Sequence, residues 1–487
     1  MADVLLGQAY YLRFDPKLWE AQRPYAPLGT LYAASYLRKR GHAAALFDAM
    51  LADSVAEWSD AIARTRPRIT AIYEDSFNYL SKMCLLRMRE AALEMLDRSR
   101  QAGVPIIVSG SDATDHPEIY LRRGAAAVIL GEGEITLADL VDRMLTARPI
   151  DDVPGIAFLD DSCAVQRTAS RQFIRSLDEL PFPAWDLVDT DRYRRIWEER
   201  HGFYSMNLAT TRGCPYHCNW CAKPIYGQRY AMRSPKAVAG EIAWLREHFA
   251  PDHLWIVDDV FGLKPGWVEE FATLIARQGT PLPFRCLMRA DQVTADVARA
   301  LAASGCTMLW MGAESGSQRV LDAMAKGLRV DDIRAASRLL KSAGIEVGFF
   351  LQFGYPGETW DDIEATLQLT RELEPADIGV SVSYPLPGTR FYERVQQQLG
   401  PKQNWIDSND LSTMYQATYA PEVYRRVHGL VHHEFRARKS AHALSGLMGN
   451  PWRARPRHLR RAASWIYNRA ALAVTRRRVL NLRGEPS

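Results

Sequence analysis

Residues 211–221 read Thr211-Arg212-Gly213-Cys214-Pro215-Tyr216-His217-Cys218-Asn219-Trp220-Cys221, with three cysteines separated by three and by two other residues. Three thiolates at this spacing in one loop can close around one face of an iron–sulfur cube. The next cysteine in the chain is Cys286, so one iron of such a cluster is left open for a substrate or cofactor. A structural zinc site is the alternative, but zinc needs a fourth ligand, and His217 would be strained between two of the cysteines.

The other four cysteines, Cys84, Cys163, Cys286 and Cys306, are scattered singly along 487 residues. A disulfide framework is typical of short secreted chains, which this chain is not. The N-terminus, residues 1–6, has an acidic residue and no basic stretch before an apolar run, unlike a secretory signal. No run of about eighteen apolar residues suggests a membrane-spanning helix. We therefore expect a cytoplasmic protein.

Apolar runs alternate with helical patterns from Ser205 to about Leu399, which predicts six strand–helix units. The predicted strands are Met206–Thr211, His253–Asp258, Phe284–Arg289, Thr307–Gly312, Glu346–Gln352 and Ile378–Ser383. Six units are too few to close an eight-stranded barrel, so the pattern predicts a partial (β/α)6 barrel of the TIM type. In such barrels the chemistry takes place at the C-terminal ends of the strands.

Residues 1–148 show the same alternation, which predicts a parallel, doubly wound sheet. The predicted strands are Asp3–Ala9, Ala43–Phe47, Ile69–Tyr73, Val104–Ser109 and Ala126–Leu130. Small residues follow the last two strands, at 109–114 and 131–134, where doubly wound sheets bind ligands. Tight strand-to-helix turns would explain these small residues equally well.

The remaining segments complete an α/β fold with a mainly helical C-terminal region. Residues 149–200, rich in Pro, Asp and Arg, are interpreted as a linker with a hairpin around Gly155–Arg167. The barrel occupies residues 201–400, and residues 401–450 form a cap over its open side. Residues 451–487 form a basic tail with ten arginines and one acidic residue, so its net charge is +9 and the rest of the chain carries about −5.

The cysteine stretch resembles the signature of the radical S-adenosylmethionine (SAM) superfamily, which has an aromatic residue, here Trp220, before the last cysteine. The resemblance implies a [4Fe–4S] cluster held by Cys214, Cys218 and Cys221. It also implies that the open iron chelates SAM through its amino and carboxylate groups. One electron then cleaves SAM to a 5′-deoxyadenosyl radical, while the protein supplies orientation and excludes side reactions.

The same resemblance extends to the predicted strand ends, where motifs of the superfamily recur. Trp255–Phe261 ends one strand in acidic residues, and Gly312–Ser317 and Gly354–Thr359 follow two others. The residues implied to bind SAM are Trp220, beside the adenine, and Asp258, Arg289, Glu314 and Ser315. Buried salt bridges or helix caps are the alternative for each position.

The first domain resembles the flavodoxin-like, cobalamin (B12)-binding module that precedes the radical SAM core in one subgroup. Ser109–Thr114 stands where the subgroup carries Gly-Gly-Pro-His-Ala-Thr, so Ser111 and Asp112 depart from the pattern. The Asp-x-His-x-x-Gly motif of classical cobalamin enzymes is absent. The residues implied to bind cobalamin are Leu28, Gly29, Ser109, Gly110, Ser111, Thr114, Gly131 and Glu132. The alternative is a related module that has lost the corrin.

The resemblance therefore implies a cobalamin-dependent radical SAM C-methyltransferase that acts on a natural-product, lipid or peptide intermediate. A radical SAM cyclase or rearrangement enzyme without methyl transfer is a second possibility, and a non-catalytic zinc protein is a third. Expected partners are a small-molecule or peptide substrate and an electron donor such as a reductase with flavodoxin or ferredoxin. The sequence contains no recognised nucleic-acid-binding motif, so a nucleic acid partner is not expected.

The basic tail interleaves apolar residues with its arginines, among them Trp465, Ile466, Leu472, Val474 and Leu480. A helix with this pattern can lie on an anionic membrane surface, which would make the protein peripheral at the membrane. A solvated extension is the alternative.

Overall fold

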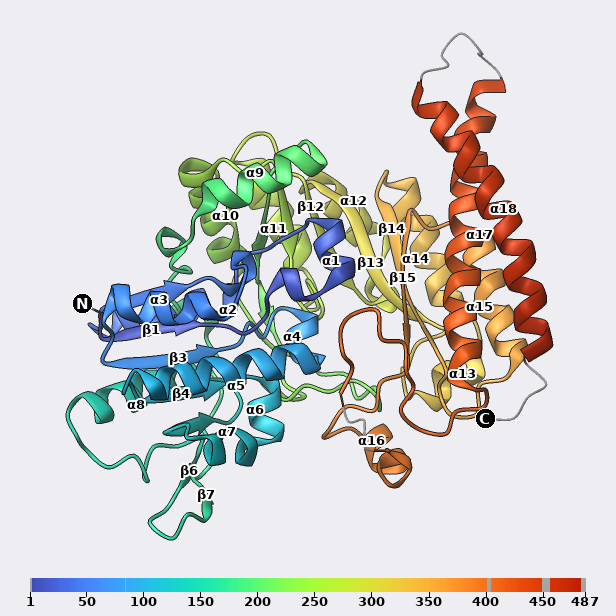
Figure 1. Cartoon of the computed structure of the whole chain (residues 1–487). Coiled ribbons are helices and arrows are strands. Elements are labelled where there is room, and N and C mark those ends of the chain that lie inside the picture. Colours follow the sequence, from blue (N-terminus) through green and yellow to red (C-terminus); the bar gives the residue numbers. More distant parts are fainter. Residues whose placement is uncertain (1, 84, 401–403, 449–455, 483–487) are drawn as a thin grey trace.

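The computed structural model describes residues 2–83, 85–400, 404–448 and 456–482 (Figure 1). Its first sheet runs in the order β2-β1-β3-β4-β5-β6-β7, with β1–β5 parallel. These strands are β1 (Val4–Gly7), β2 (Ala44–Phe47), β3 (Ile69–Tyr73), β4 (Ile106–Ser109) and β5 (Ala127–Ile129). The order 2-1-3-4-5 is that of flavodoxin, as expected. The buried apolar residues of the strands explain why both faces are covered by helices.

Helices lie on both faces of this sheet. Residues of α2 (Leu28–Lys39) and α8 (Glu134–Leu145) share one apolar core, and residues of α3 (Ala56–Thr65), α5 (Leu86–Gln101) and α7 (Pro117–Arg123) share the opposite one. The predicted hairpin forms as β6 (Ile156–Leu159) and β7 (Val165–Arg167), and it extends the sheet antiparallel to β5. Part of the predicted linker thus belongs to the first sheet.

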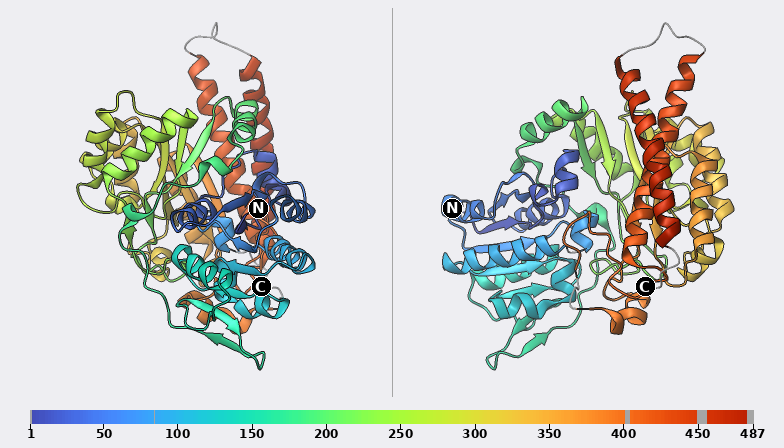
Figure 2. Two further views of the ribbon diagram at one scale, coloured as in Figure 1. Left: turned by 90° about the vertical axis from the view of Figure 1, so that its left-hand side faces the viewer. Right: turned by 45° about the vertical axis from the view of Figure 1, so that its right-hand side comes forward.

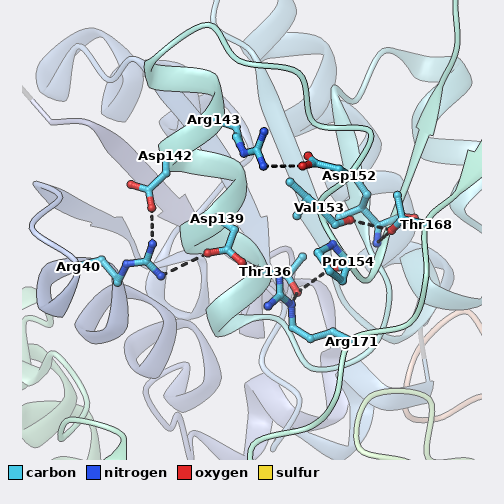
Figure 3. Close-up of polar contacts among 11 residues, drawn as sticks. Arg40, Thr136, Asp139, Asp142, Arg143, Asp152, Val153, Pro154, Thr168 and Arg171 are labelled. Carbon is cyan, nitrogen blue, oxygen red and sulfur yellow. Dashed lines mark hydrogen bonds and ion pairs between the residues drawn. The ribbon is translucent and has the colours of Figure 1, made fainter.

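Helix α8 is fixed to its surroundings by ion pairs on its outer side (Figure 3). Arg40, at the end of α2, pairs with Asp139 and Asp142 of α8. Arg171 contacts the same helix through Asp139 at 2.6 Å and Thr136 at 2.7 Å. Exposed pairs of this kind contribute at most about 1 kcal/mol each, but several together fix the direction of α8. The position of α8 is important because its first residue, Glu134, lies at the boundary between the domains.

The second sheet contains six parallel strands in chain order, β8-β11-β12-β13-β14-β15. They are β8 (Ser205–Leu208), β11 (His253–Ile256), β12 (Phe284–Met288), β13 (Cys306–Glu314), β14 (Glu346–Phe353) and β15 (Asp377–Val382). The connecting helices are α10 (Pro235–Phe249), α11 (Trp267–Ala276), α12 (Ala295–Ala303), α13 (Gln318–Ala323), α14 (Val330–Ser342) and α15 (Trp360–Leu373). The curled sheet is a half barrel, as predicted (Figure 1).

The two domains share one apolar core. Leu28, Leu31 and Tyr32 of α2 belong to the same cluster of buried residues as Leu208 and Ile256 of the half barrel. Helix α9 (Thr190–His201) packs between them, since Trp197 is fully buried and its indole N–H donates to the Pro24 carbonyl at 2.7 Å. The domains therefore form one body.

The C-terminal region ends in a helical hairpin beside β15, formed by α17 (Pro421–Met448) and α18 (Pro456–Leu482) (Figures 1 and 2). Before it, the segment 404–420 runs along the C-terminal ends of the strands. Tyr415 contacts the carbonyl of Gly354 after β14, and the Trp405 ring meets Tyr384 after β15. Trp405 also accepts a hydrogen bond from Leu86 of the first domain at 2.7 Å. No helix in the described part of the chain is long and apolar enough to cross a bilayer.

Candidate active site

The cysteine loop follows β8 and is fixed at several points. β9 (Thr211–Arg212) pairs with β10 (Ala231–Met232), which closes the base of the loop. Asn219 fixes its far side: its backbone N–H donates to Met324, its side chain donates to Ala323 at 2.7 Å, and it accepts from the Tyr355 hydroxyl at 2.9 Å. The loop is thus held above the strand ends of the half barrel.

The three cysteines lie close enough to influence one another electrostatically. Burial raises the pKa of Cys221 to about 12, and the neighbouring Cys218 and Cys214 contribute in the same direction. The pKa of Cys214 is raised as well, first by burial. Among the described residues, no three side chains of His, Cys, Asp or Glu are placed to hold one metal ion. A cube-shaped cluster binds each thiolate to a different iron, unlike a single metal ion.

Four cations surround the cysteine loop. Lys223 lowers the pKa of Cys214 and Cys221. Burial by itself lowers the pKa of Lys326, but Glu314 and Cys218 raise it above its ordinary value. Lys82, from the first domain, and Arg289 are influenced by Cys221 and Cys218 in the same way. A cluster bound to three thiolates is an anion, and these cations compensate for its charge.

Gly213 is required by the backbone immediately before Cys214. Its φ is +75°, and an added Cβ would lie 2.3 Å from the carbonyl oxygen of Arg229. A side chain therefore forces the loop away from β10. We expect Gly213→Ala to lower the iron bound after anaerobic reconstitution at least about fivefold, because the left-handed conformation and the contact both disfavour it. Gly227→Ala is the control, since that glycine also has positive φ but has nothing within 4 Å. Equal iron content in both variants would contradict the expectation.

Glu314 and Lys326 form a buried ion pair at the end of β13, with Nζ and Oε1 2.9 Å apart. Glu314 has a φ of +56°, an uncommon conformation for a residue with a side chain that is often kept at functional sites. Gly312 leaves room for the pair, because an added Cβ would lie 2.5 Å from the Glu314 carboxylate. Lys326 also lies 6.0 Å from the centre of the Trp220 ring. The structure thus brings two of the predicted SAM residues, Glu314 and Trp220, to one side of the cysteine loop.

Arg289 and Ser315 lie at the same strand ends but are engaged with protein groups. Arg289 stacks 3.7 Å from the centre of the Tyr216 ring and donates to Asp291 and to the carbonyls of Lys326 and Gly327. Ser315 is fully buried, and its hydroxyl lies 3.0 Å from that of Thr366. The indole N–H of Trp220 is buried without a hydrogen-bond partner among the described residues. Their contacts with SAM stay predictions.

Asp258 holds the strand that leads into the cysteine loop. It is 1% exposed, and it accepts hydrogen bonds from the backbone of Thr210 at 2.7 Å and Thr211 at 3.0 Å, and from the Thr210 hydroxyl. Burial raises its pKa to about 7, against these hydrogen bonds, which lower it. Because its oxygens accept these hydrogen bonds, Asp258 supports the cysteine loop through the strand that precedes it.

Glu358, in the turn after β14, makes the stability of the protein depend on pH. Burial raises its pKa to about 8, although the Gly354 N–H, 2.6 Å away, lowers it. The folded state therefore holds this proton more tightly than the unfolded chain. Its stabilising effect is present below about pH 4.5 and is lost as the pH rises through about 8.

We therefore expect the free energy of unfolding to fall by about 2–4 kcal/mol more between pH 5 and pH 8.5 in the native protein than in Glu358→Gln. Denaturant unfolding at both pH values measures this difference. Glu346→Gln, at an exposed position, serves as the control. Parallel pH dependence in the native protein and in Glu358→Gln would refute the assignment.

The residues predicted to bind cobalamin gather at the carboxyl end of the first sheet. The hydroxyl of Thr30 in α2 donates to the Tyr73 carbonyl at 2.7 Å, which brings Leu28 and Gly29 beside the end of β3. Thr114 accepts from Gly131 at 3.2 Å, which joins the turns after β4 and β5. Ser109, Gly110 and Ser111 lie in the first of these turns and Glu132 in the second.

The turn after β5 leaves room beside Gly131, whereas little room lies beneath the turns. An added Cβ at Gly131 would meet only the Ile225 carbonyl, at 3.4 Å. Beneath the turns, a cavity of about 10 Å³ lies among side chains that include Glu74, Ser109 and Asp112. Such a volume has room for about one water molecule. A corrin can therefore lie over the backbone of the turns, and anything deeper has to displace the Arg89–Asp112 ion pair.

Three residues that the sequence did not single out also lie at the site. Lys82 and Tyr79 belong to the first domain, and Arg212 contacts that domain. Lys82, in α4 (Tyr79–Met83), pairs with Asp259 at 2.6 Å. Tyr79 is 52% exposed, yet surrounding protein raises its pKa well above the ordinary value, with Tyr384, Cys221 and Glu314 contributing. Arg212 joins Glu132 and Glu134 across the boundary. Only the position of Arg212 inside the cysteine stretch could have indicated it.

Comparisons with known proteins agree with this arrangement. Residues 208–370 match the model of the radical SAM superfamily. An uncharacterized methyltransferase of Pyrococcus horikoshii is 26% identical over 78% of this chain and 80% of its own length. The anaerobic magnesium-protoporphyrin IX monomethyl ester cyclase of Synechocystis is 26% identical over 66% of this chain, which spans 62% of that enzyme.

Two solved structures share the fold across both domains. One is the radical SAM methyltransferase TsrM of Kitasatospora setae with cobalamin and a [4Fe–4S] cluster bound. Its TM-score is 0.67 at 19% identity, and the match covers 82% of this chain and 75% of that chain. The other is the cobalamin-dependent SAM radical enzyme OxsB with aqua-cobalamin bound, with a TM-score of 0.73, 18% identity, and 98% and 72% covered. With three clustered cysteines and a core that matches the family model, residues 208–370 of this chain form a radical SAM domain.

Proposed function

We propose that this protein is a cobalamin-dependent radical SAM methyltransferase that methylates a carbon atom of a natural-product, lipid or peptide intermediate. One observation carries the proposal: the carboxyl ends of the first sheet meet the cysteine loop, through Gly131 beside Ile225 and through Arg212 with Glu132 and Glu134. Two cofactors on the two domains would therefore face one shared space. The names of TsrM and of the Pyrococcus relative, both methyltransferases, favour the same reaction class.

The residues present fit the groups that this function requires. Cys214, Cys218 and Cys221 would hold the [4Fe–4S] cluster, and Glu314, Lys326 and Trp220 line the side on which SAM would lie. The turns after β4 and β5 would carry cobalamin. When bound, the cluster supplies the electron that cleaves SAM, and cobalamin supplies the methyl group.

The protein's own side chains orient a substrate between these sites. Tyr79 and Lys82 come from the first domain, and Asp259, which pairs with Lys82, comes from the half barrel. The pair is partly exposed, at 17% for the lysine and 32% for the aspartate side chain, so it can bind a polar group of the substrate. The segment 404–420, through Trp405 and Tyr415, closes the strand ends of β14 and β15 and excludes water.

Binding of hydroxocobalamin tests the cofactor part of this proposal. We expect anaerobically reconstituted protein to retain about one equivalent of hydroxocobalamin through gel filtration, with iron and sulfide in the same peak. Gly131→Val should reduce retention of the corrin, because the added side chain and the φ of +82° both alter the turn after β5. The iron content should stay unchanged, because the added Cβ meets Ile225 only at the ordinary contact distance of 3.4 Å. Protein that binds iron and sulfide but no corrin would overturn methyl transfer.

A cyclase or rearrangement enzyme is the second candidate, favoured by the Synechocystis relative, which is a cyclase. SAM labelled with deuterium in its methyl group distinguishes the two when it is incubated with reduced protein and an extract of the producing cells. A product heavier by one labelled methyl group supports methyl transfer. A new product without the label supports the cyclase.

We further propose that α18 places the protein peripherally on an anionic membrane surface. Apolar side chains lie on its solvent side, with exposed fractions of 62% for Ile466, 66% for Tyr467 and 49% for Val474. Ile466, Ala473 and Leu480 recur every seven residues and form one stripe, while Asn468 and Val479 face α17. Exposed arginines flank the stripe at 460, 461, 469, 476, 477 and 478.

The charge of α18 favours a lipid surface over other occupants. Residues 456–482 contain no aspartate or glutamate, so two copies of this face repel each other. Nucleic acid would satisfy the arginines and leave the apolar stripe in water. A membrane with anionic head groups satisfies both, because arginine reaches the head groups while the stripe enters the interface.

Flotation with vesicles tests this proposal on the protein as purified. Protein should float with vesicles that contain phosphatidylserine and should not float with pure phosphatidylcholine vesicles. Ile466→Asp should abolish flotation, whereas Ile119→Asp, which alters a 37% exposed isoleucine of the first domain, should not. Equal recovery of the native protein and Ile466→Asp would overturn the assignment.

A further inference from the structure

We infer that Arg212 is a positioning residue that fixes the cysteine loop in register with the cofactor turns of the first domain. The Arg212 clamp consists of Arg212, Glu132 and Glu134. The guanidinium lies 2.6 Å from Glu132 and 2.7 Å from Glu134, and the three side chains are 4%, 9% and 2% exposed. Arg212 stands two residues before Cys214, Glu132 belongs to the turn after β5, and Glu134 is the first residue of α8. The clamp therefore connects the two turns that carry cofactors under the proposed function.

Aromatic side chains enclose the guanidinium of Arg212 and restrict its position. The rings of Tyr32, Phe77 and Tyr226 surround it, with centroids 5.4–5.8 Å from its central carbon. The Tyr226 hydroxyl lies 2.6 Å from the hydroxyl of Ser76, which links this wall of rings to the first domain. Glu132 also accepts from the Ile174 backbone at 2.6 Å. Rings from both domains thus enclose the guanidinium, and the segment that follows the first sheet holds Glu132.

The energetics of buried charges indicate that the clamp fixes the relative position of the two domains more than it stabilises their contact. A buried ion pair gains little stability over apolar side chains of the same size, whereas loss of one partner leaves a charge in a dry site. Leu28, Leu31 and Tyr32 already join the domains through an apolar core. An apolar contact tolerates small shifts, but a planar guanidinium between two carboxylates does not. The clamp thus adds directional precision to a boundary that the apolar core already holds together.

Hydrogen–deuterium exchange tests the clamp without any cofactor. In Arg212→Gln we expect backbone amides of residues 131–140 and 211–226 to exchange at least about tenfold faster, because both turns lose the same partner. Glu134→Gln should accelerate the same two segments. Arg371→Gln is the matched control, because Arg371 also joins two glutamates, Glu364 and Glu434, but lies between α15 and α17. Acceleration in only one segment, or an equal effect in the control, would overturn the inference.

The distance between the cofactors gives a second readout, which rests on the proposed function. With hydroxocobalamin and cluster loaded and reduced to paramagnetic states, the magnetic coupling between them should be uniform in the native protein and broadened in Arg212→Gln. Arg212→Lys keeps the charge without the fork and should broaden it as well. Unchanged coupling in Arg212→Gln would overturn the positioning role. If the native protein retains no corrin, the proposed function fails, and exchange alone decides whether the clamp exists.

Discussion

Replacement of Cys221 by serine should abolish cleavage of SAM. Three thiolates would hold the cluster, and a serine hydroxyl at position 221 cannot replace the lost ligand. We expect formation of 5′-deoxyadenosine to fall by on the order of 10³-fold or more, as for other enzymes that lose an essential member of a unit. Cys214→Ser and Cys218→Ser should behave alike, because the three act together.

Measurement of iron, sulfide and 5′-deoxyadenosine after anaerobic reconstitution checks this result. Cys163→Ser is the control, because Cys163 is exposed in the turn between β6 and β7, away from the loop. It should keep the native iron content and activity. A Cys221→Ser protein with native iron and activity would show that the thiolates do not hold the cluster.

Replacement of Asp258 by alanine should destabilise the protein by about 3–5 kcal/mol, because it leaves three donors of Thr210 and Thr211 buried without an acceptor. The strand that enters the cysteine loop then loses its support, so the iron content should fall as well. Asp258→Asn keeps one acceptor oxygen and should lie between the native protein and Asp258→Ala.

Denaturant unfolding of the protein without cofactors measures its stability. Iron analysis measures whether the cysteine loop still binds the cluster. The paired measurements separate support of the loop from direct contact with SAM. A variant that stays fully stable and binds the cluster, but no longer binds SAM, would contradict the supporting role and restore the predicted ligand role of Asp258.

The architecture of both sheets could be predicted because it follows from local apolar patterns. Each predicted strand of the half barrel overlaps an observed one, such as His253–Asp258 with β11. The hairpin around Gly155–Arg167 was also found, since turn residues separate two short alternating runs. Its attachment to the first sheet was not predicted, because no local pattern states which edge a hairpin pairs with.

The candidate site was predictable only where a motif is continuous in sequence. Cys214, Cys218 and Cys221 share one loop, so their spacing indicates their chemistry. Contacts between distant segments carry no such signal: Glu132 and Arg212 are 80 positions apart, and Lys82 and Asp259 are 177 apart. In the tail, the interleaved pattern favoured a helix, and α18 covers residues 456–482. The packing of Asn468 and Val479 against α17 needed the tertiary structure.

The most direct test of the account is whether reduced protein cleaves SAM. Anaerobically reconstituted protein, treated with dithionite and SAM, should form 5′-deoxyadenosine and methionine in equal amounts, and the Cys214→Ser protein should form neither. Native protein that carries a full complement of iron and sulfide and leaves SAM intact would contradict the claim that the three thiolates present an open iron to SAM.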